Sequence, residues 1–232
     1  MAHNSLKKSQ KLLDFSQRFR QSNYVSSFTN FKSSQSQKFK KPNRAAVLIC
    51  LFEQGDDIYV ILTKRSSNLS SFSGHVSLPG GKTDERDTDY IRTALREAEE
   101  EIGLDPALVD VVTVLQPFVT KMAGNVTVVP VIGILWDKQA FNPILNAGEV
   151  ESIFYAPFEM FLKDENRREE GRQFEGEKYL FHYFQYEIDN HVYVIWAVTA
   201  SILITAATIV YQRPPDFEPR MPKFWNKNHS RL

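Results

Sequence analysis

The apolar residues are grouped into short runs separated by polar residues, and most runs have the composition of strands. "AAVLICLF" (45–52) and "IYVILTKR" (58–65) are rich in β-branched residues, and the "EQGDD" between them is typical of a hairpin turn. "DVVTVLQPFVT" (110–120) and "VTVVPVIGILW" (126–136) predict two more strands, with "KMAGN" as their turn. These four runs predict the sheet of a folded domain.

A different periodicity occurs between residues 89 and 102. Ile91, Ala94, Leu95, Ala98 and Ile102 recur at helical spacing and give the segment one apolar face. A glycine at 103 and a proline at 106 follow, and both are signals that end a helix. We therefore predict a helix over this segment.

The second half of the chain alternates again. "EVESIFYAPFEMFL" (149–162) predicts a strand that leads through Pro157 into a short helix, and residues 179–198 predict two strands around Asp189 and Asn190. Residues 192–211 are uncharged and about as long as a membrane span. Because their first half is β-branched and aromatic, we favour a strand followed by a buried helix. This mixture of strands and helices predicts an α+β domain with a mixed sheet.

The two ends of the chain differ from its middle. Residues 1–43 are basic and Ser-rich, and we predict a mostly flexible extension with one amphipathic segment around Leu12, Leu13, Phe15 and Phe19. Residues 213–232 are proline-rich and polar, which predicts a flexible, extended tail. One domain is expected between them, over residues 44–212.

Composition narrows the choice of partners. The net charge is zero, which gives no indication of nucleic acid as a partner. The one cysteine, Cys50, excludes a disulfide framework, and its apolar run favours a small buried side chain over a nucleophile.

The predicted helix carries acidic residues where a helix is least able to hold them. Glu97 and Glu101 are one turn apart, Glu100 lies beside them, and carboxylates in a last turn oppose the helix dipole. A divalent cation such as Mg²⁺ or Mn²⁺ would turn this repulsion into attraction. The alternative is a solvated acidic face that pairs with Arg92 and Arg96.

Just upstream, Gly80 and Gly81 are candidates for close approach of the backbone to a metal or phosphate, although Pro-Gly-Gly also occurs in ordinary turns.

The stretch "GGKTDERDTDYIRTALREAEEEIGL" (80–104) resembles the Nudix box, in which a glycine loop precedes Arg-Glu-apolar-x-Glu-Glu-x-Gly-apolar. The second half matches at every defined position, which are Arg96, Glu97, Ala98, Glu100, Glu101, Gly103 and Leu104. Asp87 stands where the box has a glutamate, and eight residues rather than seven separate it from Arg96.

The resemblance implies an αβα sandwich around a mixed sheet, and hydrolysis of a nucleoside diphosphate linked to another group. It implies that Glu97, Glu100 and Glu101 hold Mg²⁺ or Mn²⁺ and that Arg96 orients the glutamates through an ion pair. Glu100 and Glu101 are equal candidates for the catalytic base. Glu149 is a weaker acidic candidate, for which surface charge is the alternative.

A second motif narrows the resemblance. "ILTKRSSNLSSFSGHVSLPGG" (61–81) resembles the motif of the coenzyme A diphosphatase subfamily, in its peroxisomal type. The positions that match are Leu62, Thr63, Arg65, Ser66, Gly74, Pro79, Gly80 and Gly81. Ser70 stands where the motif has an arginine, and Leu78 replaces a phenylalanine. We expect Arg65, Gly80 and Gly81 to bind substrate, with a structural salt bridge as the alternative for Arg65.

These resemblances imply a metal-dependent diphosphatase that splits CoA or acyl-CoA into 3',5'-ADP and (acyl-)4'-phosphopantetheine. One alternative is a Nudix hydrolase of another pyrophosphate, such as NADH or ADP-ribose. The other is a nucleotide-binding module without catalysis.

The sequence also carries two candidate addresses. Ser230, Arg231 and Leu232 are a conservative variant of the C-terminal Ser-Lys-Leu signal, which predicts a peroxisomal location and a peroxisomal import receptor as partner. The alternative is the mitochondrion, because the N-terminal segment is basic, Ser-rich and poor in acids. No transmembrane segment is expected.

Overall fold

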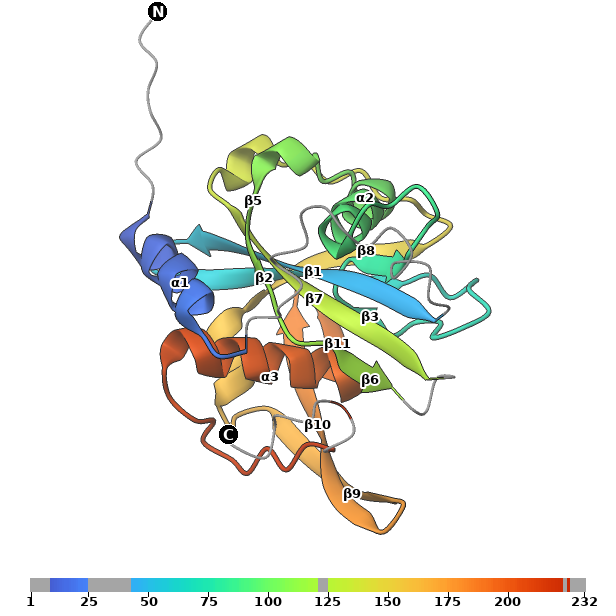
Figure 1. Cartoon of the computed structure of the whole chain (residues 1–232), viewed down its shortest axis with the longest axis vertical. Helices are drawn as coiled ribbons and strands as arrows, with labels where there is room; N and C mark the ends of the chain where they lie inside the picture. Colours follow the sequence, from blue (N-terminus) through green and yellow to red (C-terminus); the bar gives the residue numbers. More distant parts are fainter. Residues whose placement is uncertain (1–8, 25–42, 121–124, 223–224, 226–232) are drawn as a thin grey trace, which may run out of the picture.

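The structure is a computed structural model that describes residues 9–24, 43–120, 125–222 and Trp225 (Figure 1). Its larger sheet has eight strands. These are β1 (Arg44–Gln54), β2 (Asp57–Arg65), β3 (Val76–Ser77), β4 (Gly80–Lys82), β5 (Val109–Val114), β6 (Phe118–Thr120), β7 (Val126–Leu135) and β8 (Val150–Pro157).

The larger sheet is mixed. Its central path runs β3-β2-β1-β7-β5, and β4, β6 and β8 pair with β1, β7 and β2. The strands β1 and β7 are parallel, with Val47 opposite Pro130, and the other pairs are antiparallel. The hairpin predicted from "EQGDD" is the β1–β2 pair. The predicted α+β class with a mixed sheet is confirmed.

Helices cover both faces of this sheet. One face packs against α2 (Tyr90–Ile102), and the other packs against α1 (Gln10–Gln21) and α3 (Ala197–Tyr211) (Figure 1). Each face buries its own apolar cluster, so the sheet lies between two cores. Within the described residues, three short 3₁₀ helices complete the order, at Pro106–Leu108, Lys138–Ala140 and Phe158–Leu162.

A second, three-stranded sheet precedes α3. It consists of β9 (Arg167–Phe174), β10 (Glu177–Ile188) and β11 (His191–Trp196), in the order β11-β10-β9. The segment 192–211 is therefore a strand end followed by a buried helix, as favoured from its composition. Among the described residues, no helix is long and apolar enough to cross a membrane.

Two strands departed from the pattern-based prediction. The run 110–120 contains two strands, β5 and β6, because Gln116 and Pro117 interrupt the pairing with β7. Strand β9 was missed because "RREEGRQF" has almost no apolar residues, and its side chains are mostly exposed. The predicted turn at "KMAGN" lies mostly outside the described residues.

The described parts of both chain ends are packed against the domain rather than loose. In α1, the Phe15 ring meets Tyr211 of α3 edge to face at 5.1 Å, and Arg18 donates to the Val210 carbonyl. In the tail, the Arg220 carbonyl accepts from the Leu180 amide at 2.9 Å, and Trp225 is buried. The ends pack because each carries large apolar side chains among its polar residues.

Candidate functional site

Helix α2 presents its acidic side chains at a fixed angle because both of its ends are capped. The Asp89 side chain accepts from the Arg92 amide at 2.8 Å, and Gly103 ends the helix in the left-handed region at φ 69°. Ala94, Ala98 and Ile102 are buried against the sheet. This packing directs Glu97 and Glu101, one turn apart, toward the glycine loop.

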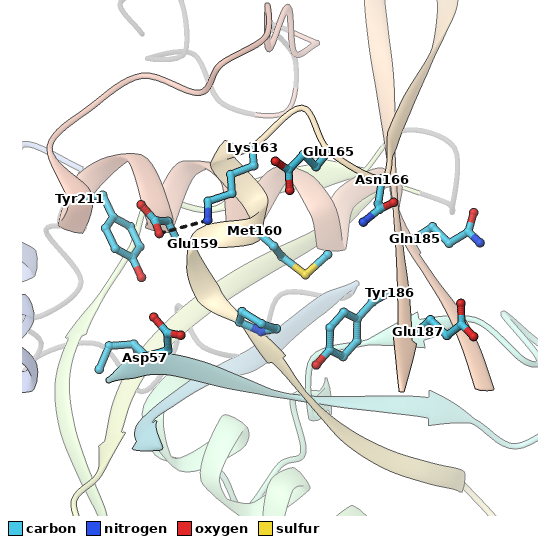
Figure 2. Close-up of a pocket in the computed structure, with 12 residues that line it drawn as sticks. Asp57, Glu159, Met160, Lys163, Glu165, Asn166, Gln185, Tyr186, Glu187 and Tyr211 are labelled. Atoms are coloured by element: carbon cyan, nitrogen blue, oxygen red, sulfur yellow. Dashed lines mark ion pairs between the residues drawn. The ribbon is translucent and has the colours of Figure 1, made fainter. Parts of the chain in front are cut away.

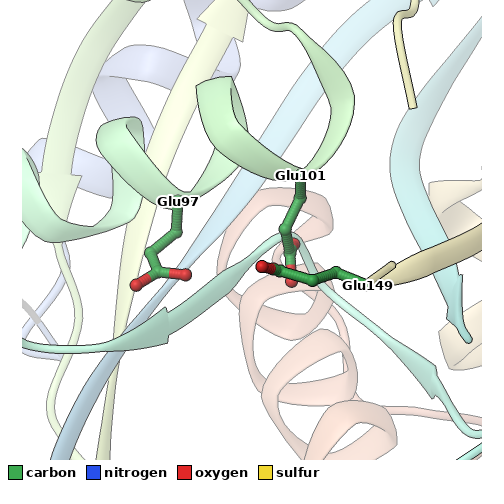
Figure 3. A group of neighbouring side chains, drawn as sticks. All are labelled: Glu97, Glu101 and Glu149. Atoms are coloured by element: carbon green, nitrogen blue, oxygen red, sulfur yellow. The ribbon is translucent and has the colours of Figure 1, made fainter. Parts of the chain in front are cut away.

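Three carboxylates converge beside that loop (Figure 3). Glu97, Glu101 and Glu149 each offer an oxygen within 4.8 Å of the others. Glu149 comes from the loop before β8, and its carbonyl accepts from the Ser66 amide at 2.8 Å. We call these three residues the carboxylate cluster. Hard oxygen donors from three acidic residues fit Mg²⁺ or Mn²⁺.

Burial disfavours the fully ionised form of the carboxylate cluster. Glu101 is 2% exposed, and burial raises its pKa to about 7, against the opposing effects of the Gly80 amide and Arg65. Burial also raises the pKa of Glu97, although the neighbouring Arg96 opposes it. A bound cation would offset this desolvation cost and the mutual repulsion. Two of the three glutamates that the sequence pattern grouped on this helix, Glu97 and Glu101, thus converge in the structure.

The glycine loop touches the carboxylates directly. The Gly80 amide donates to Glu101 Oε2 at 3.1 Å, and Gly80 has a φ of +150° that disfavours other residues. A Cβ on Gly81 would lie 2.3 Å from Glu97 Oε2. The structure thus brings both glycines to the carboxylate cluster. Their predicted contact with substrate stays a prediction.

Arg96 is held by Asp87. Its Nε and Nη2 donate to the two Asp87 oxygens at 3.0 and 2.9 Å, and the Asp87 side chain is only 1% exposed. Burial pushes the pKa of Asp87 up, but hydrogen bonds from Arg96, the Asp84 amide and Thr93 outweigh it and lower the pKa. The shorter residue at this position therefore still reaches its arginine.

Arg96 in turn contacts two glutamates. Its Nη1 lies 2.9 Å from Glu97 Oε1 and 2.9 Å from Glu100 Oε2. Glu100 differs from the carboxylate cluster, because its side chain is 51% exposed and it is not among the three converging oxygens. The metal and catalytic roles of Glu97, Glu100 and Glu101, and the orienting role of Arg96, stay predictions. The structure brings together Glu97, Glu101 and Glu149.

Arg65 ends β2 at the edge of the cluster. Its Nη1 lies 3.7 Å from Glu101 Oε1, and its Nε is buried without a hydrogen-bond partner in the described part of the chain. An unpaired buried donor costs free energy, so a phosphate oxygen is a fitting partner for it. Arg65 therefore lies at this site, and both of its predicted roles, substrate binding and a structural salt bridge, stay predictions.

Sequence reasoning undervalued Glu149. It lies 48 residues after Glu101 in the chain, so no helical spacing links them. The backbone joins them instead, because Asn146 donates to the Glu101 carbonyl and accepts from the Glu149 amide. The only local indication of a functional role for Glu149 was its place in "NAGE", a segment typical of a turn, just before a strand.

A separate hollow of about 320 Å³ lies elsewhere on the surface (Figure 2). Asp57, Glu159 and Lys163 are among its lining residues, and none of the predicted site residues is. Because Asp57 and Arg65 are at opposite ends of the nine-residue β2, the hollow is roughly 25 Å from the cluster edge. It is not part of the candidate site.

Comparison with known proteins identifies the family of the chain. The NUDIX domain family model matches residues 42–193. The chain is 64% identical over 185 residues to "Nudix hydrolase 15, mitochondrial" and 59% identical over 193 residues to "Nudix hydrolase 22, chloroplastic", both of Arabidopsis thaliana. These matches cover 79% and 83% of this chain but only 64% and 63% of the relatives, so the chain spans less than two thirds of their length. It is 36% identical to the mouse "Peroxisomal coenzyme A diphosphatase NUDT7", over 76% of this chain and 74% of that protein.

The predicted peroxisomal location is wrong. The relatives at 64% and 59% identity are named for the mitochondrion and the chloroplast, and the one named peroxisomal is 36% identical. Ser230, Arg231 and Leu232 lie outside the described residues. A three-residue resemblance to a receptor-read address arises easily by chance, and the import receptor inferred from it loses its support.

The match to the family model extends over most of the described sheet and includes α2, the glycine loop and all three acidic residues of the cluster. It also includes Asp87 and Arg96, whose ion pair fixes the start of the acidic run. From the motif, the mixed sheet and this match together, the chain belongs to the NUDIX domain family.

Proposed function

We propose that the protein is a divalent-metal-dependent hydrolase that splits the pyrophosphate of CoA or acyl-CoA into 3',5'-ADP and (acyl-)4'-phosphopantetheine. The carboxylate cluster, with the cation Arg65 at its edge, carries the proposal. The subfamily motif in residues 61–81 and the name of the mouse relative support the CoA part.

The residues divide the task by position. Glu97, Glu101 and Glu149 would hold Mg²⁺ or Mn²⁺, which neutralises charge on the phosphoryl oxygens and so eases attack by water. Arg65 would bind a phosphate oxygen, and Asp87 with Arg96 would keep Glu97 in place. The cluster acids are better placed than Glu100 to accept the proton of the attacking water, because Glu100 is half exposed and paired with Arg96.

An activity screen tests the proposal. The protein with Mg²⁺ or Mn²⁺ is incubated with CoA, an acyl-CoA, NADH and ADP-ribose, and the products are identified by mass. We expect 3',5'-ADP from the CoA compounds. Cleavage of NADH or ADP-ribose in preference to CoA would transfer the proposal to another pyrophosphate, and binding without cleavage would favour a non-catalytic module.

Three variants sharpen the screen. The double variant Glu97→Gln/Glu101→Gln should lose turnover, whereas Glu99→Gln, an exposed glutamate of the same helix that lies outside the carboxylate cluster, should retain it. Ser70 is exposed in the loop between β2 and β3. Ser70→Arg restores the cation of the subfamily motif and should raise CoA turnover if that cation binds the anionic substrate.

The basic, acid-poor residues 1–43 and the name of one plant relative support a mitochondrial location. The chloroplast in the name of the other relative is the competing outcome. Imaging of the chain with a fluorescent protein at its C-terminus distinguishes them.

A further inference from the structure

The loop between β2 and β3 displays an aromatic side chain that the domain does not bury. Phe72 is 56% exposed, and its backbone lies in the left-handed region at φ 55°. A bulky residue in that region is strained, and glycine or asparagine would fit it with less cost. The chain therefore tolerates both an exposed ring and an unfavourable backbone at one position, which indicates a function for the ring.

Phe72 is the outer member of a series of rings. It meets His75 at 5.8 Å between ring centroids, His75 meets Trp196 at 5.2 Å, and Trp196 stacks on Tyr183 at 5.3 Å with an angle of 9°. The guanidinium of Arg168 lies 3.8 Å from the centre of the Tyr183 ring. Because β3 and β11 lie side by side, the inner rings support the outer ones from a second element (Figure 1). Phe72 and His75 thus form a supported edge-to-face pair.

This aromatic pair is tied to the candidate site through Arg65. The Arg65 amide donates to the His75 carbonyl at 2.9 Å, and the Gly74 amide donates to the Arg65 carbonyl at 3.2 Å. The same Arg65 reaches toward Glu101 and has a buried Nε with no partner in the described residues. The loop that carries Phe72 and His75 is therefore hydrogen-bonded at its base to the residue whose side chain reaches toward the carboxylate cluster.

We propose that Phe72, supported by His75, stacks on the nucleobase of the substrate and determines its affinity. In a nucleoside diphosphate, one sugar separates a planar base from the phosphate to be bound and cleaved. A ring on the loop that is joined to Arg65 would therefore suit the base of a substrate whose phosphates lie at the carboxylate cluster. Aromatic rings favour a planar ligand over an aliphatic chain, because stacking adds attraction beyond area burial. The inference rests on the proposed hydrolase activity, but it holds for any nucleoside-diphosphate substrate and not only for CoA.

Equilibrium binding tests the inference without turnover. The full chain with Mg²⁺ is titrated calorimetrically with ADP, which has a base, and with methylenediphosphonate, which has the two phosphoryl groups alone. Phe72→Asn removes the ring and suits the left-handed backbone, so the fold is retained. We expect Phe72→Asn to weaken ADP binding by about 5- to 20-fold, as for loss of one base–aromatic stack. Binding of methylenediphosphonate should change less than twofold.

Two further variants give the comparison. Phe72→Tyr keeps the ring and should bind ADP as the unchanged protein does. Val192→Ala removes another exposed apolar side chain, outside this loop, and should have no effect. The melting temperature of Phe72→Asn should be unchanged or higher, because asparagine relieves the backbone strain.

Unchanged ADP binding in Phe72→Asn would overturn the inference, as would an equal loss for both ligands or no ADP binding by the unchanged protein. A lower melting temperature together with weakened binding of both ligands would show a structural role instead and would also overturn it. Failure of the proposed function is a separate result, namely absence of pyrophosphate hydrolysis while ADP and methylenediphosphonate still bind.

Discussion

Replacement of Glu101 by glutamine should stabilise the protein in the absence of a divalent cation, although it removes a proposed metal ligand. Glu101 is buried and has a pKa raised from 4.5 to about 7. The folded protein therefore favours the protonated side chain. The stability from that proton is complete below the unfolded pKa and is lost as the pH rises through about 7.

The size of this effect follows from the pKa. The shift corresponds to about 3 kcal/mol of lost stability at pH 8, and about 1 kcal/mol at pH 5, because one pKa unit is worth about 1.4 kcal/mol. Glutamine has nearly the same shape, is neutral at every pH, and its carbonyl can accept from the Gly80 amide as Glu101 Oε2 does at 3.1 Å. The stability difference between Glu101→Gln and the unchanged protein should thus grow by about 2 kcal/mol from pH 5 to pH 8.

The assay is urea unfolding at both pH values in buffer with a chelator. Glu99→Gln is the matched control, because Glu99 is an exposed residue of the same helix. With Mn²⁺ at 1,000 times its Kd in place of the chelator, the order should reverse, since a ligand at that concentration stabilises the protein that binds it by about 4.1 kcal/mol. A Glu101→Gln variant that is no more stable at pH 8 without cation, or whose advantage does not grow with pH, would refute the reasoning.

Three other changes have distinct expected results. Gly81→Ala places a Cβ where Glu97 Oε2 now lies, at 2.3 Å, and should weaken Mn²⁺ binding at least tenfold in calorimetry with little change in melting temperature. Asp87→Asn removes the buried charge that holds Arg96, and denaturant unfolding should show a loss of about 3–5 kcal/mol, as for a broken buried ion pair. Unchanged stability would mean that Arg96 finds another partner. Trp225→Ala should cost about 3–5 kcal/mol by the same measurement, because the ring is 4% exposed; a loss under about 1 kcal/mol would show that the tail contributes little.

The regular parts of the fold were predictable because they repeat a simple pattern. The hairpin of β1 and β2 and the apolar face of α2 follow from alternation and helical spacing, and each buries its apolar side as expected. Strand β9 was not predictable in this way. It is an edge strand with charged side chains on both faces, so its pairing with β10 is set by the neighbour and not by its own periodicity.

The candidate site was predictable to the extent that it lies on one helix. Glu97 and Glu101 are placed by the geometry of α2, and the sequence is sufficient to put them on one side. Glu149, in the loop before β8, and Arg65, at the end of β2, are distant in the sequence from α2. The pairing of β2 with β8 and the hydrogen bonds of Asn146 bring them to the same edge. The sequence pattern grouped Glu100 with Glu97 and Glu101, but in the structure Glu100 contacts Arg96 instead. One residue along a helix turns the side chain by about 100°, which is enough to direct Glu100 away from the cluster that Glu101 joins.

Helix α3 lies beyond the residues that match the family model, which end at 193. Nine of its side chains are buried, and it packs against the sheet, α1 and the segment that follows it. A fragment cut at the limits of the family-model match would lack both α1 and α3 and would expose much of the apolar cluster that they cover, so we expect it to aggregate. The segment that the family model matches is thus smaller than the segment that must be expressed.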